Sequence, residues 1–285
     1  MSTLPTDRGE ASFEDYKHPY DDTHALVEAH RCLYCEDAPC TTACPTHIDV
    51  PGFIRKVSTA NTWGAARSIF EANILGMSCA RVCPVEVLCV GSCVYNNMDQ
   101  PPIQIGKLQR YATDRAYAEG WQFFEAGAPT GKSVGLIGGG PASLAAAHRL
   151  RRYGHAVTIY EQRNHLGGLN VNGIAAYKMK ADRALSEVQW VLSIGGVDVK
   201  TGVEVGPHGE LSWAELEAKH DALLIGIGLG PDHLIDGTQT TEGAYGAVDF
   251  IEQLNCANGA KEVVNAAAEG KCAAEAMHTY LMGDR

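Results

Sequence analysis

The sequence has no hydrophobic run of the length that a membrane span requires. A helix that crosses a bilayer needs about 18 or more consecutive apolar residues, whereas the longest apolar run here, residues 222–230, has the length of a strand. Residues 1–20 are polar and acidic, and they lack the basic start and apolar middle of a signal peptide. These two absences predict a cytoplasmic protein that does not enter a membrane.

Positive charge is also scarce in this sequence. The 285 residues include 23 Lys and Arg against 34 Asp and Glu, which gives a formal net charge of -11. Such an excess of negative charge repels nucleic acids and anionic membrane surfaces, so both are excluded as expected partners. Low-complexity tracts are absent, and the length is typical of about two globular domains.

Cysteine, in contrast, is abundant and clustered. The chain has 10 cysteines, and most of them lie in two short sets. The first set has the spacing Cys32-x2-Cys35-x4-Cys40-x3-Cys44 before Pro45, and the second has Cys79-x3-Cys83-x5-Cys89-x3-Cys93 with Pro84 inside it. Thiolates are soft ligands, and runs of four with a Cys-Pro step are typical of iron–sulfur sites. Two sets predict two clusters and therefore electron transfer.

Disulfide bonds and structural zinc are the two alternatives to iron–sulfur clusters for these thiols. A disulfide framework needs an oxidising compartment, which nothing in the sequence indicates. Structural zinc is the stronger rival, because zinc sites also begin with Cys-x2-Cys. Zinc ribbons, however, repeat such pairs across a spacer of about 15–20 residues, whereas each set here packs its cysteines into one stretch. The spacing favours iron–sulfur clusters over zinc.

A dinucleotide-binding fingerprint begins at Ser133. A short apolar strand leads into the turn Gly138-Gly-Gly140, a helical run follows to about Tyr153, and a second strand ends at Glu161. In this motif the first glycine allows the tight turn, the second admits a pyrophosphate to the helix N-terminus, and the acid binds a ribose hydroxyl. Ser143 stands where a third glycine is usual, and it is small enough for close packing of helix and strand.

The remaining patterns divide the chain into four segments. We expect a loosely held arm at 1–24, a helical cluster-binding domain at 25–130, a Rossmann-like domain at 131–254 and a closing segment at 255–285. Apolar residues at helical spacing over 52–57 and 63–70 predict helices that support the clusters. Further strands are predicted at 201–205 and 222–230, residues 127–132 form a linker, and a helix rich in small residues covers 262–281 and must pack closely against a neighbour.

Several of these stretches together resemble a known family. They are residues 31–45, 79–84, 105–109, 161–179 and 257–271. The family comprises the small subunit of bacterial glutamate synthase, the NAD(P)H-accepting half of dihydropyrimidine dehydrogenase and related subunits, and the dihydropyrimidine dehydrogenase type is the most similar. The resemblance implies an α/β protein in which an N-terminal all-α domain with two [4Fe–4S] clusters precedes a Rossmann-like FAD domain closed by a C-terminal helix.

The resemblance also implies that the two cysteine sets exchange ligands. One [4Fe–4S] cluster would be held by Cys32, Cys35, Cys40 and Cys93. The other would be held by Cys44, Cys83 and Cys89, with the side-chain oxygen of Gln109 as its fourth ligand. Spacing alone names Cys79 in place of Gln109. We favour Gln109, and Cys79 remains the alternative.

In this family the dinucleotide at the glycine turn is FAD. The N-terminal end of the closing helix would point at the flavin and stabilise its reduced, anionic form. Lys178 is a weak candidate for a catalytic residue near the flavin. The residues expected to bind the cofactor are Gly138, Gly140, Pro141, Ala142, Glu161, Gln162, Gly168, Leu169, Val205, Gly228, Lys261, Glu262 and Val263.

Together these features predict an NAD(P)H-dependent oxidoreductase subunit. Electrons would pass between NAD(P)H, FAD and the two clusters, to or from a catalytic large subunit. Members of the family carry a second glycine-rich domain for the nicotinamide, and no second fingerprint is found; the place for it is the junction of Asn255 and Cys256. The alternatives are an adaptor that keeps its clusters for structure and docks a large subunit, and a zinc-bearing Rossmann module.

Overall fold

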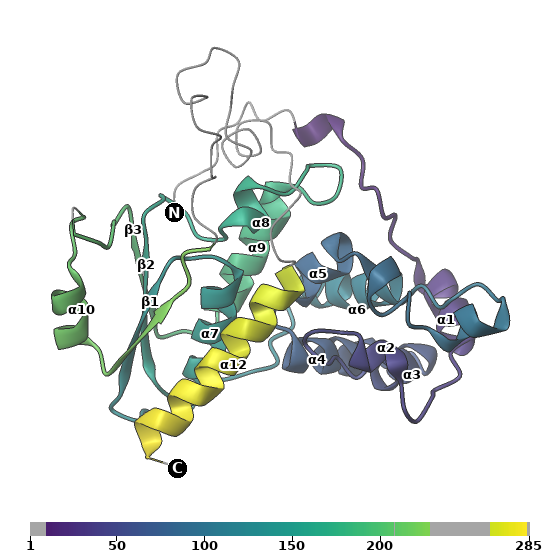
Figure 1. The fold of residues 1–285 in the computed structure, drawn as a ribbon. Coiled ribbons are helices and arrows are strands. Elements are labelled where there is room, and N and C mark those ends of the chain that lie inside the picture. Colours follow the sequence, from purple (N-terminus) through teal and green to yellow (C-terminus); the bar gives the residue numbers. More distant parts are fainter. Residues whose placement is uncertain (1–9, 208, 229–262, 284–285) are drawn as a thin grey trace, which may run out of the picture.

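The computed structural model describes residues 10–207, 209–228 and 263–283. This part of the chain comprises a helical region, residues 10–118, and a region built on a four-stranded sheet (Figure 1). None of the helices in these ranges combines the length and the apolarity of a membrane span. The predicted α/β class, with an all-helical first part, is confirmed. The junction of Asn255 and Cys256 lies outside the described residues.

Short helices form the first region. Three of them begin at a side-chain cap, because Asp21, Asp49 and Asn61 each accept a hydrogen bond from a backbone N–H of the next turn. The predicted apolar faces are confirmed, since side chains such as Phe53 and Ile69 are fully buried. The elements are η1 (Glu10–Ser12), α1 (Asp22–His30), α2 (Pro39–Thr42), α3 (Val50–Ser58), α4 (Thr62–Ala72), α5 (Gly76–Val82), η2 (Val85–Val87), η3 (Val94–Met98) and α6 (Ile105–Ala118).

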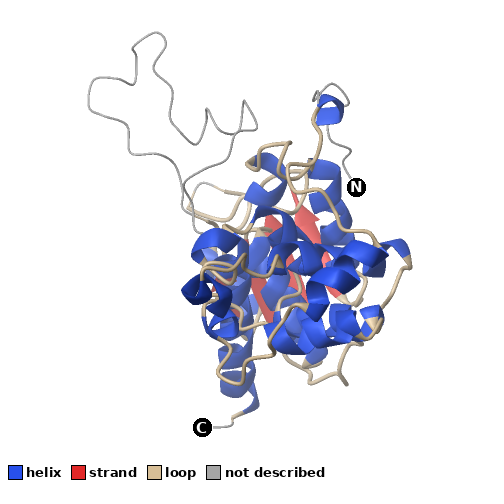
Figure 2. Cartoon of the chain, turned by 90° about the vertical axis from the view of Figure 1, so that its right-hand side faces the viewer, coloured by secondary structure: helices blue, strands red, loops and turns tan. Residues whose placement is uncertain are grey.

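Parallel strands and helices alternate in the second region. The strand order is β3-β2-β1-β4, and each neighbouring pair is parallel. The helix α7 connects β1 to β2, so the predicted βαβ unit is confirmed. Seen from the side of the helical region, the strands lie behind a layer of helices (Figure 2). The elements are β1 (Ser133–Ile137), α7 (Pro141–Arg152), β2 (Ala156–Glu161), α8 (Leu169–Asn172), α9 (Ala181–Leu192), β3 (Val197–Thr201), α10 (Trp213–Lys219), β4 (Ala222–Ile225) and α12 (Val263–Met282).

Two predicted strands need correction at their ends. The strand expected at 201–205 is wrong, because β3 covers Val197–Thr201 and shares only Thr201 with it, and Val205 forms only an isolated bridge with Leu211. The reason is Gly202, whose φ of 73° turns the chain out of the extended conformation. The strand predicted from residue 222 is confirmed only as far as Ile225, and residues beyond 228 lie outside the described part.

The helix of small residues, α12, packs on α7 (Figure 1). Its Gly270 lies so close to α7 that an added Cβ would be 2.0 Å from the backbone oxygen of Ala142. Ala267 and Ala274 on the same helix are buried as well. The prediction that this helix packs closely against a neighbour is therefore confirmed, and the neighbour is the helix that follows the glycine turn.

The described part of the N-terminal arm is held more firmly than its sequence predicts. The backbone N–H of Tyr16 donates to the oxygen of Tyr177, and the buried Arg110 pairs with Asp15. These contacts tie residues 15–17 to the helical region and to the sheet region at once. The arm lacks apolar periodicity, so its sequence gives no sign of these partners, which lie about a hundred or more positions away.

Candidate cofactor sites

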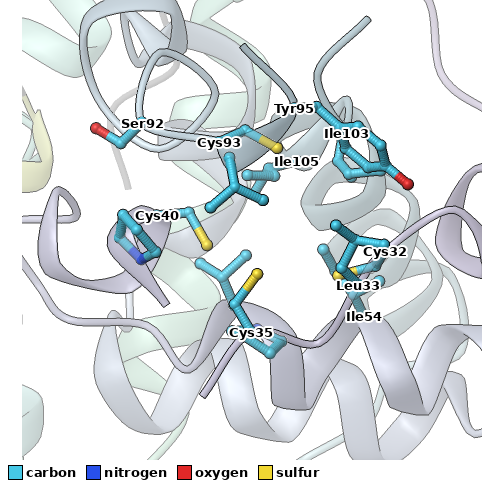
Figure 3. A pocket seen from close by; sticks show the side chains of 14 residues that line it. Cys32, Leu33, Cys35, Cys40, Ile54, Ser92, Cys93, Tyr95, Ile103 and Ile105 are labelled. Carbon is cyan, nitrogen blue, oxygen red and sulfur yellow. The ribbon is translucent and has the colours of Figure 1, made fainter. Parts of the chain in front are cut away.

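Four of the predicted thiols line one cavity (Figure 3). Cys32 follows α1, Cys35 lies in the next loop, Cys40 belongs to the short helix α2, and Cys93 caps η3. Three of these cysteines come from the first set and one from the second, and their sulfurs face the same space. The cavity has a volume of about 370 Å³ with its open mouth included. The structure thus brings together the four residues that the family resemblance names for the first cluster.

The surroundings of this cavity are apolar. Val50, Ile54, Ile103 and Ile105 line it beside the thiols. Burial, together with the nearby Cys32 and Cys93 thiols, raises the pKa of Cys40 to about 11. Thiols in such a setting become thiolates only when a positively charged group binds and displaces their protons. The site is therefore suited to a metal cluster rather than to a reactive cysteine.

The spread of the sulfurs bears on the choice between zinc and a larger cluster. Across residues 10–207, 209–228 and 263–283, no three His, Cys, Asp or Glu side chains surround a single point as one metal ion requires. Four thiols around one cavity are compatible with a cluster that fills the space between them, and the choice of iron and sulfur over zinc rests on the cysteine spacing.

A second group of thiols forms around Cys89. Burial, followed by the proximity of Cys44 and Cys83, raises the pKa of Cys89 to about 12. Cys44 belongs to the first cysteine set, whereas Cys83 and Cys89 belong to the second. Cys44 thus lies near Cys83 and Cys89, and Cys40 of the first set also acts on Cys89. The proximity of Cys44 to two cysteines of the second set agrees with the exchange of ligands that the resemblance implies.

One candidate for the eighth ligand, Cys79, belongs to α5, and the other, Gln109 on α6, lies beside that helix. Cys79 is buried, its sulfur accepts a hydrogen bond of 3.1 Å from the Asn73 amide, and Cys83 lies next to it. Gln109 is also buried, and its amide nitrogen donates to the backbone oxygen of Gly76 at 2.8 Å. That bond fixes the Gln109 side chain through its nitrogen.

The glycine turn has the shape that a bound dinucleotide needs. Gly138 has a φ of 94°, and a Cβ there would lie 2.4 Å from the oxygen of Gly226. An added Cβ at Gly140, in contrast, meets no described atom within 4 Å. Gly168 approaches the turn from the following loop, where its Cβ would lie 2.9 Å from the Cα of Gly140. Gly138 is thus required by the fold, whereas Gly140 borders open space.

Glu161 lies at the end of β2, and its carboxylate is buried and bound. It accepts hydrogen bonds from the backbone N–H groups of Gly139, at 2.6 Å, and Arg163, at 2.8 Å. The carboxylate therefore fixes the glycine turn as well as facing its opening. Two polar atoms of the dinucleotide region, Ser143 Oγ on α7 and Asn170 Oδ1 on α8, are buried without a hydrogen-bond partner among the described residues. Unpaired buried polar atoms are uncommon, and a bound ligand is one way to satisfy them.

The other predicted cofactor residues lie at different places. Pro141 and Ala142 open α7, Gln162 and Leu169 are exposed, and Gly228 lies in an open turn after β4. Val205 packs with Ile137, Tyr160 and Leu216. Lys178 precedes α9, and Val263 is buried in the first turn of α12. The predictions for Lys261 and Glu262 lie outside the described residues.

Sequence reasoning did not identify three polar residues at these sites. Asn170 directly follows the predicted residues Gly168 and Leu169 and was passed over, whereas Lys17 has no motif around it that could have marked it. Glu187, on α9, is buried and accepts hydrogen bonds of 3.1 Å from the N–H groups of Met77 and Ser78 at the start of α5. Burial raises the pKa of Glu187 to about 7. A charged residue on an otherwise apolar helix face was the only signal in the sequence for it.

Comparison with known proteins agrees with these two sites. Residues 9–121 match the family described as dihydropyrimidine dehydrogenase domain II with a 4Fe–4S cluster, and residues 136–172 match the NAD(P)-binding Rossmann-like domain. The chain thus combines an iron–sulfur region with a dinucleotide-binding region. Both matched regions contain the motifs identified in the sequence, the cysteine sets and the glycine turn, and the chain is similar to subunits of the dihydropyrimidine dehydrogenase type.

Two curated relatives show how far the similarity extends. The NAD-dependent dihydropyrimidine dehydrogenase subunit PreT of Salmonella typhimurium is 39% identical over 235 residues, which are 82% of this chain and 56% of the relative. The protein of the same name from Escherichia coli K12 is also 39% identical over the same shares of both chains. This chain therefore spans little more than half the length of the relatives it matches.

Proposed function

We propose that this chain is the electron-transfer part of a multi-subunit oxidoreductase, with two [4Fe–4S] clusters on its helical region and FAD at its glycine turn. The observation that carries the proposal is the exchange of Cys44 and Cys93 between the two thiol groups. Domains with two iron–sulfur clusters use such an exchange of ligands. It connects the two sites, so that each cluster is held by both cysteine sets.

The proposed ligands follow the two groups of thiols. Cys32, Cys35, Cys40 and Cys93 hold one cluster, and Cys44, Cys83 and Cys89 hold the other, with Gln109 as its fourth ligand. Gln109 is favoured because the family resemblance names it, and its amide nitrogen is held by the oxygen of Gly76. Cys79 is the alternative, since its sulfur accepts from Asn73 and lies next to Cys83. When bound, the clusters supply one-electron carriers.

At the glycine turn, the residues present fit a dinucleotide. The open space at Gly140 gives room for a pyrophosphate at the N-terminus of α7, where the helix dipole favours negative charge. Ser143 and Asn170 offer buried polar atoms, and Glu161 holds the turn in place. FAD bound there supplies the exchange between a hydride and single electrons. Lys178 and the first turn of α12 at Val263 are proposed to border the flavin.

The proposed partner is a catalytic subunit that meets the helical region near the first thiol group. Three of the four thiols in that group are only partly buried and their cavity is open, whereas Cys44 and Cys83 are buried. An electron leaves a protein most readily from its more exposed cluster. The names of the relatives suggest that the partner acts on pyrimidines and that NAD(P)H is the other electron carrier.

Metal and flavin analysis tests this function. Protein purified without oxygen is expected to contain about eight irons per chain with equal sulfide, and one FAD. Stoichiometric zinc with negligible iron would contradict the proposal. Full iron without FAD, or FAD that no nicotinamide reduces in the complete complex, would instead support the structural adaptor.

A further inference from the structure

One cation lies directly beside the second thiol group. The ammonium of Lys17 donates a hydrogen bond of 2.9 Å to the backbone oxygen of Cys83. Lys17 is half-buried, and it comes from the N-terminal arm rather than from either cysteine set. Its position was not expected from the sequence, and nothing in the proposed ligand sets uses it.

The arm is fixed so that this lysine keeps its position. Arg110, buried on α6, donates to the backbone oxygen of Lys17 and to the carboxylate of Asp15. The same guanidinium pairs with Asp114 at 3.1 Å. One residue further along, Tyr16 donates its N–H to Tyr177 at 2.8 Å. The arm is thus anchored at three successive residues, Asp15, Tyr16 and Lys17 itself, which restrains the backbone that carries the lysine side chain.

The electrostatic surroundings of Lys17 are mixed. Burial lowers the pKa of Lys17, whereas the nearby Glu86, Cys83 and Cys89 raise it, and the Lys178 ammonium opposes them. Two of the three attracting groups are cysteines assigned to the second cluster. Once those cysteines are thiolates around a cluster, the negative charge that faces Lys17 increases.

We propose that Lys17 sets the reduction potential of the cluster held by Cys44, Cys83 and Cys89, by stabilising its reduced form. Reduction adds one negative charge to the cluster, and a fixed cation nearby lowers the free energy of that state. Net charge, hydrogen bonding and exposure are the means by which a protein adjusts such potentials. Lys17 bonds to the backbone of Cys83, a proposed ligand, and touches no substrate. It is therefore a positioning and tuning residue. This inference rests on the proposed function.

Potential measurements on matched variants test the proposal. Lys17→Met removes the charge, Lys17→Arg keeps it, and Lys107→Met removes a charge elsewhere in the helical region, where the ammonium lies 5.2 Å from the ring centre of Tyr20. Redox titrations of the anaerobic protein, followed by electron paramagnetic resonance, report each cluster separately. Lys17→Met is expected to lower the reduced-to-oxidised ratio of one cluster about tenfold at a fixed potential, which is about 59 mV for one electron. The reduced-to-oxidised ratio of the other cluster in Lys17→Met is expected to stay within about threefold of the wild type. The same holds for both clusters in Lys17→Arg and in Lys107→Met.

The outcomes separate this inference from the function on which it rests. Absence of iron from the wild-type protein would contradict the proposed function itself. Two intact clusters with unchanged potentials in Lys17→Met, or an equal shift in Lys17→Arg, would overturn the role of the charge. If Lys17→Met loses iron, Lys17→Gln provides the test, because it keeps a hydrogen-bond donor without the charge. A wild-type potential in that variant would also overturn the proposal.

Discussion

At the scale of single residues, the thiols have unequal surroundings. Cys44, Cys79, Cys83 and Cys93 are buried, whereas Cys32, Cys35, Cys40 and Cys89 are partly accessible. Cys272, on the outer side of α12, is exposed and belongs to neither group. The chain therefore provides its own comparison between proposed ligands and a cysteine with no expected ligand role.

Replacement of a single proposed ligand should remove the cluster that it holds and leave the other cluster in place. Cys89→Ala is expected to reduce the iron content from about eight to about four per chain, because the three remaining ligands are too few to hold the second cluster. Cys35→Ala should cause the same loss at the first cavity, and Cys272→Ser should leave the iron content unchanged. Iron and sulfide analysis measures this. Retention of all the iron in both alanine variants would contradict the ligand assignment.

The glycine turn allows an equally direct test. Gly140→Leu puts its Cβ where no described atom beyond the neighbouring residues lies within 4 Å, so we expect the fold to tolerate it. The pyrophosphate of FAD would lose its approach to α7, and flavin retention is expected to fall at least tenfold while iron stays constant. Gly206→Leu is the control, since a Cβ there is equally free of contacts. The flavin absorbance of the purified variants measures FAD occupancy. Unchanged FAD occupancy in Gly140→Leu would contradict the proposed site.

At the scale of elements, α7 connects the parts of the dinucleotide region. Its N-terminus faces the glycine turn, and α12 packs against it at Ala142. His148 is buried on α7, where its ring meets that of Phe124 with centroids 5.3 Å apart. Burial, followed by repulsion from Arg152 and Arg149, lowers the pKa of His148 from 6.5 to about 3. The helix therefore keeps a neutral histidine in its core.

This histidine should make stability depend on pH. Between about 3 and 6.5 the unfolded chain binds a proton that the folded chain does not. Stability from His148 is therefore complete above about pH 6.5 and falls by about 1.4 kcal/mol per pH unit below it. The thermal midpoint should fall less between pH 7.5 and pH 5.5 in His148→Leu than in the wild type or in the exposed control His18→Leu. Parallel pH profiles of all three proteins would contradict this expectation.

At the scale of the whole molecule, the sequence predicted what local patterns encode. Cysteine spacing predicted two clusters, the family resemblance implied how the cysteines divide between them, and the turn from Gly138 to Gly140 predicted the βαβ unit. The strand expected at 201–205 was placed too late, because Gly202 turns the chain out of the extended conformation directly after Thr201. The contacts of the arm could not be predicted, because Lys17 and Cys83 lie far apart in sequence and their hydrogen bond uses a backbone oxygen. Long-range contacts of this kind leave no periodic pattern in the sequence.

Glu187 is the long-range contact that joins the two regions most directly. It belongs to α9 of the sheet region, and it bonds to the first turn of α5, the helix that leads to Cys83. One carboxylate oxygen accepts from Met77 and Ser78 at 3.1 Å, and the other accepts from the Ser78 hydroxyl. All of these donors would be buried and unpaired without it. The start of α5 is thus held in place by a residue more than a hundred positions away.

Replacement of Glu187 should distinguish this bonding role from a role of its charge. Glu187→Ala is expected to destabilise the protein by about 2–4 kcal/mol, because buried donors lose their acceptor, and to speed hydrogen exchange in α5. Glu187→Gln keeps an oxygen for both N–H groups and a polar atom for Ser78, so its stability should stay close to that of the wild type. The exposed Glu217→Ala, on α10, is the control and should change neither quantity. Thermal unfolding and amide exchange measured on the iron-loaded protein check the series. Equal destabilisation by alanine and glutamine would show that the negative charge, rather than the hydrogen bonds, holds α5 to α9.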